Sequence, residues 1–264
     1  MNSVVCIKQV IDPEAPPASF KIDAAANRVI PPTGVSPVVD PYSEYAVEAA
    51  LKIKDAKGGK VTALSLGSGQ LRDVVKKPLA MGADDLVLLE DKAFDDGDSW
   101  SIAYALAMAI KKIGAYDLVL CGRQSADWGA GQVGSILAEI LGIPVITLAC
   151  DIEGIDGGVK VKRIVSDGFE IVQAPLPSLV TVSSEIGMPR LPAGMRLMMA
   201  RKKVIPIWKA ADVGVDAALI DKANAHSEVT GLTVPSRKVE CEMVTGATPG
   251  EAAANLASKL ANLI

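Results

Sequence analysis

Short apolar runs alternate with helical segments over the first 150 residues. The runs Ser3–Lys8, Lys60–Leu66, Asp85–Glu90, Tyr116–Cys121 and Val145–Cys150 have the length and composition of buried strands. Strands that alternate with helices form βαβ units, whose crossover helices cover a parallel sheet. The alternation therefore predicts an α/β fold with a Rossmann-like parallel sheet and crossover helices.

The helical segments carry their own start and stop signals. Asp40 is a predicted N-cap with Pro41 at the first helical position, and Gly58 stops that helix. Pro78 interrupts the next helical pattern, which predicts a kink or a short break. Two further helices are predicted over 98–112 and 131–141.

The pattern changes after Asp151, where two short strands follow one another. Gly158–Ser166 and Phe169–Gln173 are joined by a turn at Asp167-Gly168, which indicates an antiparallel hairpin. Ser178–Val182 then has the composition of a further buried strand.

The C-terminal tail differs from the rest of the chain. From Val213 to Glu240 its apolar residues are scattered without a strong period, and Pro249–Leu263 is a predicted alanine- and leucine-rich helix. Such a tail has too little apolar surface of its own to bury. We therefore expect an α/β nucleotide-binding domain over 1–210 and an extended C-terminal arm over 211–264 that needs another surface.

Charge and residue counts exclude several classes of function. The net charge of the 264 residues is −4, and the sequence has no basic stripe interleaved with aromatic residues. Both observations argue against nucleic-acid binding. A single histidine, His226, leaves little for a Ser-His-Asp triad or a histidine metal site. The four cysteines show no C-x-x-C spacing, which fits a reduced, cytoplasmic protein without a disulfide framework.

One strand, loop and helix start together have the layout of a phosphate site. The buried run that ends at Cys121 is followed by a turn-rich loop, Gly122–Ala130, and by a helical pattern from Gly131. The first turn of a helix has unpaired N–H donors and a partial positive charge, and glycine lets an anion approach it closely. We interpret the stretch as a nucleotide site; glycines that serve only a turn and a helix start would give the same pattern.

The same stretch contains Gly129, Gly131 and Gly134, a literal Gly-x-Gly-x-x-Gly. Asp151 lies about 20 residues after Gly131, where a dinucleotide-binding unit places its ribose-binding acid. About seven residues separate Cys121 from Gly129, whereas the fingerprint puts its first glycine at the end of the strand. An NAD-dependent Rossmann-type dehydrogenase is therefore one alternative, and a nucleotide-sensing α/β module is another.

Six sequence blocks resemble a known family in the order in which they occur. The blocks are Val5-Cys-Ile-Lys-Gln-Val-Ile-Asp12, Asp40-Pro-Tyr-Ser-Glu-Tyr-Ala-Val-Glu-Ala-Ala50, Leu79-Ala-Met-Gly-Ala-Asp84, Asp117-Leu-Val-Leu-Cys-Gly-Arg-Gln124, Leu176-Pro-Ser-Leu-Val-Thr-Val182, and Pro189-Arg190 with the basic run ending at Lys203. Together they resemble the β subunit of electron transfer flavoprotein, including its FixA branch, over nearly the whole chain.

The resemblance implies a heterodimer with an α subunit that holds the redox-active FAD and on which the C-terminal arm packs. It implies an electron carrier between an acyl-CoA dehydrogenase-type flavoprotein and a downstream quinone oxidoreductase or ferredoxin, with no catalytic residue and no stand-alone enzyme activity. In the family, the β subunit binds an adenine nucleotide at the carboxyl ends of its parallel strands. That nucleotide is AMP in many members and, in electron-bifurcating members, a second FAD that takes a hydride from NADH.

The nucleotide site is carried over from the family residue by residue, and it overlaps the loop that the helix-dipole reasoning selects. In addition, Lys8 and Arg123 are basic groups whose position places them near the flavin or the phosphates. The family positions are Cys6, Asp40, Pro41, Tyr42, Ser43, Leu66, Gly122, Arg123, Gln124, Ser125, Ala126, Asp127, Trp128, Gly129, Ala130, Gly131, Gln132 and Val133.

The loop departs from both nucleotide-binding patterns of the family. Bifurcating members usually have D-G-D-T-A-Q-V-G where this chain has Asp127-Trp-Gly-Ala-Gly-Gln-Val-Gly134, and AMP-binding members usually have D-D-D-x-N-Q-T-G. Trp128 replaces a glycine of the bifurcating pattern, and the second acid is absent. Loss of an acid beside a phosphate relieves repulsion, so we expect phosphate binding in either case. The region 91–107 is more similar to the FixA branch, which favours FAD over AMP.

Two segments are expected to meet partner proteins. The family often has Arg-Glu in the hairpin strand that faces the flavin domain of the α subunit; here Arg163 is kept and Ile164 replaces the acid. In the family, a loop after the Pro-Arg pair carries a leucine that docks into acyl-CoA dehydrogenases. Gly194 takes that place, with Leu191 and Met195 as neighbours.

Methionine is a flexible anchor that fills hydrophobic pockets, so we expect the docking function to persist. The alternative is that Met195, Met198 and Met199 form the core side of a short helix.

Overall fold

A nine-stranded sheet forms the centre of the computed structural model, which describes residues 1–234 and 241–261. Its strands lie in the order β11-β10-β9-β12-β8-β1-β6-β7-β13. From β9 to β13 neighbouring strands are parallel, whereas β10 is antiparallel to both β9 and β11. The strands are β1 (Ser3–Ile7), β6 (Val61–Leu66), β7 (Asp85–Leu89), β8 (Leu118–Gly122), β9 (Val145–Ile155), β10 (Gly158–Val165), β11 (Gly168–Pro175), β12 (Ser178–Val182) and β13 (Ile207–Trp208).

Helices cover both faces of this sheet, as the predicted βαβ units require. Successive side chains of a strand point to opposite faces, so β1 contributes Val5 and Ile7 to one core layer and Val4 and Cys6 to the other. The first layer is closed by α1 (Pro41–Lys57), α3 (Lys77–Met81) and α6 (Gly194–Lys202). The second layer is closed by α4 (Ser99–Ile113) and α5 (Val133–Leu141).

The start and stop signals of the helices are confirmed. Asp40 caps α1 and Gly58 ends it. The helical pattern that contains Pro78 is broken at Lys76 into α2 (Arg72–Val75) and α3. The helix predicted from residue 131 begins two residues later, at Val133, because Gly131 has a φ of +65° and stays in the loop.

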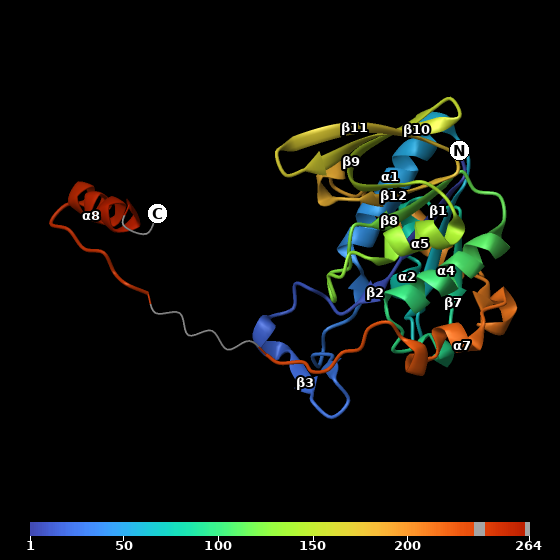
Figure 1. Cartoon of the computed structure of the whole chain (residues 1–264), viewed down its shortest axis with the longest axis horizontal. Helices are drawn as coiled ribbons and strands as arrows, with labels where there is room; N and C mark the ends of the chain where they lie inside the picture. The colour runs from blue at the N-terminus through green and yellow to red at the C-terminus, as the bar shows by residue number, and fades with distance from the viewer. Residues whose placement is uncertain (235–240, 262–264) are drawn as a thin grey trace.

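The predicted hairpin is confirmed, and it extends the main sheet. The strand predicted to end at Cys150 continues as β9 to Ile155, with its first part paired to β12 and its second part to β10. Leu148, with a φ of +61°, lies in the first part, next to a register shift opposite Val180 and Val182. In Figure 1 the strands β9 to β11 consequently overhang one side of the molecule.

Several short strands were not predicted. One is β13 at the edge of the sheet, and the others are β2 (Gln9–Val10) and β5 (Val38–Val39), which pair with each other. Strands of two residues are too short to show a period in the sequence.

The runs Phe20–Ile22 and Arg28–Ile30, joined by Asp23–Asn27, predict a small hairpin. This prediction is confirmed, because β3 (Lys21–Asp23) pairs with β4 (Arg28–Ile30) in antiparallel fashion.

The C-terminal tail first packs on the sheet domain and then leaves it. Val213 and Ile220, the latter in α7 (Ala217–Ile220), are buried beside α4. The helix α8 (Pro249–Ala261) buries none of its side chains, and Figure 1 shows it separated from the sheet domain. Residues 262–264, which include the predicted helix end at Leu263, lie outside the described residues. None of the described helices has the length and hydropathy that crossing a bilayer demands.

Candidate nucleotide-binding site

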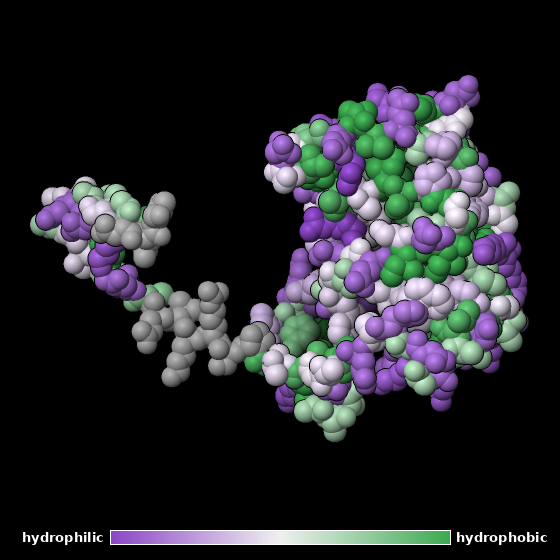
Figure 2. Space-filling model, in the orientation of Figure 1, coloured by the Kyte–Doolittle hydropathy of each residue, from purple (hydrophilic) through white to green (hydrophobic). Residues whose placement is uncertain are grey.

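The order of the sheet has a switch point between β1 and β8. From β1 the chain proceeds to β6 and β7 on one side, and it then returns to place β8 on the other side of β1. In open α/β sheets, ligands bind at such a point, outside the carboxyl ends of the strands. The yellow-green loop after β8 lies there in Figure 1, where the outline of Figure 2 recedes between the overhang and the β3 region.

Asp40 joins the start of α1 to this loop. Its Oδ2 accepts hydrogen bonds from the backbone nitrogen of Ser43 at 2.9 Å and from the Ser43 hydroxyl at 3.1 Å. Its Oδ1 accepts a hydrogen bond of 2.7 Å from the backbone nitrogen of Ala126. The side chain is buried, and burial raises the pKa of Asp40 although these hydrogen bonds oppose the shift.

A second connection holds the loop to the end of β1. The ammonium group of Lys8 lies 2.7 Å from a carboxylate oxygen of Asp127. The backbone nitrogen of Lys8 donates a hydrogen bond of 3.2 Å to the hydroxyl of Ser43. Lys8, Ser43 and Asp127, three predicted site residues from separate segments of the chain, therefore lie together.

Tyr42 packs against the first residues of the loop. Its hydroxyl accepts a hydrogen bond of 3.2 Å from the Gln124 amide, and the guanidinium of Arg123 lies 5.7 Å from the centre of its ring. A side chain at Gly122 would place its Cβ 2.7 Å from the Cβ of Tyr42. Glycine at 122 therefore allows α1 to approach the end of β8 closely.

The helix after the loop begins without a side-chain cap. Asp40 caps α1 and Asp98 caps α4, whereas Gln132 at the start of α5 makes no capping bond. Gly129 and Gly131, with φ values of +64° and +65°, shape the approach to this end. First-turn N–H groups of a nine-residue helix thus have no partner from the cap position, which is the arrangement that suits a phosphate oxygen.

The remaining predicted site residues form the floor and the rim. Cys6 and Cys121 are neighbours on β1 and β8, and contact with Cys121 together with burial raises the pKa of Cys6 well above its usual value. The Cys6 thiol therefore acts as a small apolar group, and Cys121 is buried beside it. Leu66 ends β6, the neighbour of β1 on the other side, and Trp128 lies on the rim with 57% of its surface exposed.

The dinucleotide fingerprint is not assembled in this fold. Gly134 serves packing, because a Cβ there would lie 2.6 Å from the Cγ2 of Thr181 on β12. Asp151 belongs to β9, which β12 separates from β8, and its carboxylate accepts a hydrogen bond from the backbone nitrogen of Ile152. Among the residues that the structure describes, no three His, Cys, Asp or Glu side chains form a group that would hold a metal ion.

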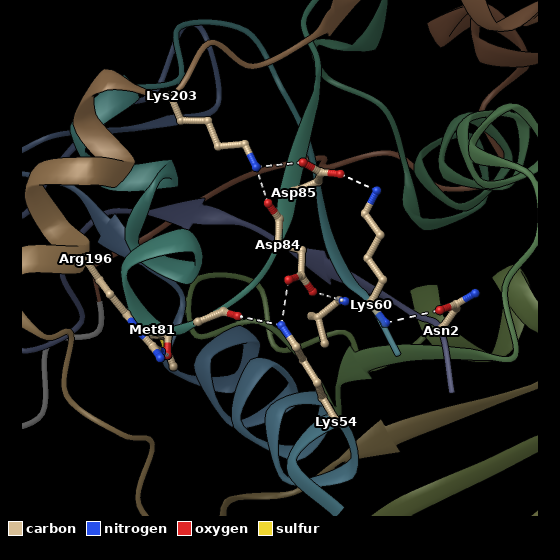
Figure 3. A network of polar contacts seen from close by, with 10 residues as sticks. Asn2, Lys54, Lys60, Met81, Asp84, Asp85, Arg196 and Lys203 are labelled. Atoms are coloured by element: carbon tan, nitrogen blue, oxygen red, sulfur yellow. Dashed lines mark hydrogen bonds and ion pairs between the residues drawn. The ribbon is translucent and has the colours of Figure 1, made fainter. Parts of the chain in front are cut away.

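The α6 helix presents its methionines to solvent. Met195, Met198 and Met199 are exposed by 77%, 64% and 65%, so the interpretation of these residues as helix core is wrong. The side of α6 that faces the sheet domain carries the buried Ala200, together with Arg196, which donates a hydrogen bond of 3.3 Å to the carbonyl of Met81. Figure 3 shows this side of the helix.

The segment before α6 is held by an ion pair with a buried carboxylate. The guanidinium of Arg190 binds both oxygens of Glu48, at 2.9 and 3.0 Å, and its outer nitrogen lies 2.9 Å from Asp55. Glu48 is buried in α1. Leu191 follows directly and is 90% exposed. Arg190 was part of a sequence block but was not selected as a site residue, because no spacing in the sequence connects it to Glu48.

Arg163 is engaged within the overhanging strands. Its guanidinium contacts the carbonyl and the hydroxyl of Thr147 on β9, at 3.2 and 3.0 Å. It also lies 3.1 Å from the carboxylate of Glu170, its cross-strand partner on β11. Glu170 therefore supplies an acid beside Arg163, although Ile164 replaces the acid of the family.

A family profile and three similar relatives indicate the same protein family. A family profile described as electron transfer flavoprotein domain matches residues 29–213. The chain is 37% identical over 261 residues to the caffeyl-CoA reductase-Etf complex subunit CarD of Acetobacterium woodii, covering 98% of each chain. It is 38% identical to an electron transfer flavoprotein subunit beta of Megasphaera elsdenii, covering 90% of this chain and 89% of the relative. It is 35% identical to the protein FixA of Azorhizobium caulinodans, covering 91% and 86%.

Proposed function

The chain belongs to the electron transfer flavoprotein family and is similar to its β subunits, and from this premise we propose a ligand. We propose that the chain binds an adenine nucleotide, FAD or AMP, at the loop 122–133. The observation that carries this proposal is the uncapped start of α5 at the switch point of the sheet. The loop that leads to it is held in place by Asp40 and Lys8. This arrangement leaves backbone donors directed at a phosphate.

The residues around the loop have distinct roles in this proposal. Arg123 and the α5 start bind phosphate oxygens, and Lys8 neutralises Asp127 so that the loop does not repel an anion. Asp40 positions the loop through Ala126. If the nucleotide is FAD, its isoalloxazine ring supplies the capacity to accept and release electrons.

The nucleotide count decides between the two ligands. The chain is co-expressed with its α subunit, and the nucleotides released on denaturation are counted per heterodimer. Two FAD would place the second flavin in this subunit and make NADH-dependent bifurcation the leading mechanism. One FAD and one AMP would make the chain the structural and docking half of a simple carrier. NAD in place of both would contradict the proposal and favour the dehydrogenase alternative.

A charge placed at the α5 start tests the location of the site. Gln132→Glu is isosteric and puts a carboxylate where we expect the phosphate. It should weaken nucleotide binding roughly tenfold or more by repulsion, while the helix itself is unaffected or stabilised because acids suit helix N-termini. Gln173→Glu makes the same charge change on the exposed edge strand β11 and should leave binding unchanged.

We further propose that the chain carries electrons between an acyl-CoA dehydrogenase-type flavoprotein and a quinone oxidoreductase or ferredoxin. The exposed apolar side chains of Leu191 and Met195 support docking, and Arg201 and Lys202 in the last turn of α6 favour an acidic rim on the partner. One relative is named as a subunit of a caffeyl-CoA reductase-Etf complex, which supports a partner that acts on a CoA ester. A pull-down in which the heterodimer binds none of the candidate dehydrogenases would contradict this docking role.

The C-terminal arm is proposed to pack on the α subunit. Support comes from the exposed Leu256 and Leu260 of α8, which bury no surface on the described part of this chain.

Four free cysteines support a reducing, cytoplasmic setting.

A further inference from the structure

We propose that the exposed methionines around α6 are a modification site at which a hydroperoxide switches docking off. The inference rests on the proposed docking role of this surface. The site consists of Met188, Met195, Met198 and Met199, which we call the methionine patch. The oxidant class is hydrogen peroxide or an organic hydroperoxide.

The patch gathers thioethers on one side of one helix. Met195, Met198 and Met199 are spaced i, i+3 and i+4, so they share a face of α6. Met188, 85% exposed, lies in the segment that leads to this helix. Half of the eight methionines of the chain are therefore concentrated within 12 residues.

The helix is held so that it cannot turn these side chains inward. Lys203 binds the carboxylate of Asp85 at 2.7 Å and the carbonyl of Asp84, as Figure 3 shows. On the same side of the fold, Lys76 donates to the carbonyls of Arg201 and Lys203, at 2.9 and 2.8 Å. These polar contacts and the buried Ala200 thus hold one side of α6 against the sheet domain, while its methionines face solvent. The thioethers are kept accessible by this arrangement.

The chemistry needs only the sulfur and the peroxide. A sulfur lone pair attacks one oxygen of the peroxide, an S–O bond forms, the O–O bond breaks, and water or an alcohol leaves with the proton. The sulfur is oxidised by two electrons and the peroxide is reduced by two. The product, methionine sulfoxide, is polar and is reduced back by methionine sulfoxide reductases.

The conversion acts where docking depends on apolar contact. A thioether fills a hydrophobic pocket without needing a hydrogen bond, whereas a sulfoxide oxygen buried in such a pocket loses its water and has no partner. We expect oxidation of the patch to weaken docking by about tenfold or more, since a few central side chains dominate an interface. The sheet domain should stay intact, because Met81 is buried and Met108 is half-buried.

The test uses the heterodimer with its α subunit, treated with hydrogen peroxide and then with dithiothreitol to restore oxidised thiols. Peptide mass spectrometry maps the sulfoxides, and binding to the dehydrogenase is measured before and after treatment. We expect sulfoxides at the patch ahead of Met81 and Met108, a loss of docking, and recovery after treatment with both sulfoxide reductases. Protection of the patch, or full docking with the patch oxidised, would overturn the proposal.

Two variants separate modification from general damage. Met195→Leu with Met198→Leu and Met199→Leu removes three thioethers, so the docking that this variant shows before peroxide should persist after it. The same three positions changed to Gln imitate the polar product and should dock poorly without peroxide. Equal peroxide sensitivity of the Leu variant would contradict the proposal. An untreated heterodimer that binds no dehydrogenase would contradict the docking function and the switch, whereas the sulfoxide map would still decide whether the patch is a modification site.

Discussion

The Oδ1 atom of Asp40 lies 2.7 Å from the backbone nitrogen of Ala126, 86 residues further along the chain. The other oxygen of the same carboxylate caps α1 through Ser43. One buried side chain therefore fixes both the start of a helix and the loop proposed to bind a nucleotide. This double role makes Asp40 the point at which stability and nucleotide binding can be separated by mutation.

Asp40→Ala should lower the free energy of unfolding by about 1–3 kcal/mol, since it removes a helix cap and leaves buried donors unpaired. It should also weaken AMP or FAD binding by the heterodimer, because the loop loses its anchor. Asp98→Ala is the matched control. The Oδ1 atom of Asp98 caps α4 by accepting a hydrogen bond of 2.9 Å from the backbone nitrogen of Ser101, and it does not contact the loop. Calorimetry of unfolding and of binding should show a stability loss for both variants and a binding loss for Asp40→Ala alone.

Gly122→Ala should destabilise the protein by about 1–3 kcal/mol, because its Cβ would lie 2.7–2.9 Å from side-chain and backbone atoms of Tyr42. Relief of this clash requires α1 to move away from the end of β8. Gly194→Ala is the control, since a Cβ at that position meets no atom within 4 Å. Thermal unfolding of the two variants should differ clearly; equal melting temperatures would contradict the close approach of α1.

Arg190→Ala should cost about 3 kcal/mol, because it leaves the buried carboxylate of Glu48 without its partner. The bond with Glu48 also raises the pKa of Arg190, so the guanidinium keeps its charge throughout the usual pH range. Asp55→Asn removes only the outer contact, at an exposed carboxylate, and should cost less than about 1 kcal/mol. Urea unfolding measures both losses, and similar values for the two variants would contradict the dominant role of Glu48.

Acid should release α6 from the sheet domain. Hydrogen bonds from Lys203, which follows α6 directly, and from Lys60 lower the pKa of Asp85. A carboxyl group whose pKa is lowered in the folded state stabilises that state while it is ionised. Its contribution to stability is complete above the unfolded pKa of about 4 and is lost as the pH falls through the folded pKa. Hydrogen exchange of the α6 peptide, corrected for its intrinsic rate, should rise below about pH 4.

The variant Asp85→Asn provides the control for this acid transition. It should show faster exchange of α6 at neutral pH and a weaker dependence on pH, because the amide does not titrate. An unchanged transition in this variant would assign the acid sensitivity to other carboxyl groups.

Local signals accounted for most of the fold. The alternation of apolar runs with helical segments predicted the parallel strands, and Asp40 with Pro41 predicted the start of α1. The break between α2 and α3 followed from Pro78. The strand β13 was missed because two residues carry no period, and the length of β9 was missed because the strand changes partners midway.

The sequence by itself determined what depends on neighbouring residues: helix caps, glycine turns, the period of buried positions and the blocks that resemble the family. Only the tertiary structure decided which distant groups meet, such as Asp40 with Ala126 and Arg190 with Glu48. It also decided that the methionines of α6 face solvent. A short helix with apolar residues at many positions does not specify its buried side; here that side is set by the carbonyl of Met81 and the carboxylate of Asp85, which lie over 100 residues earlier in the chain.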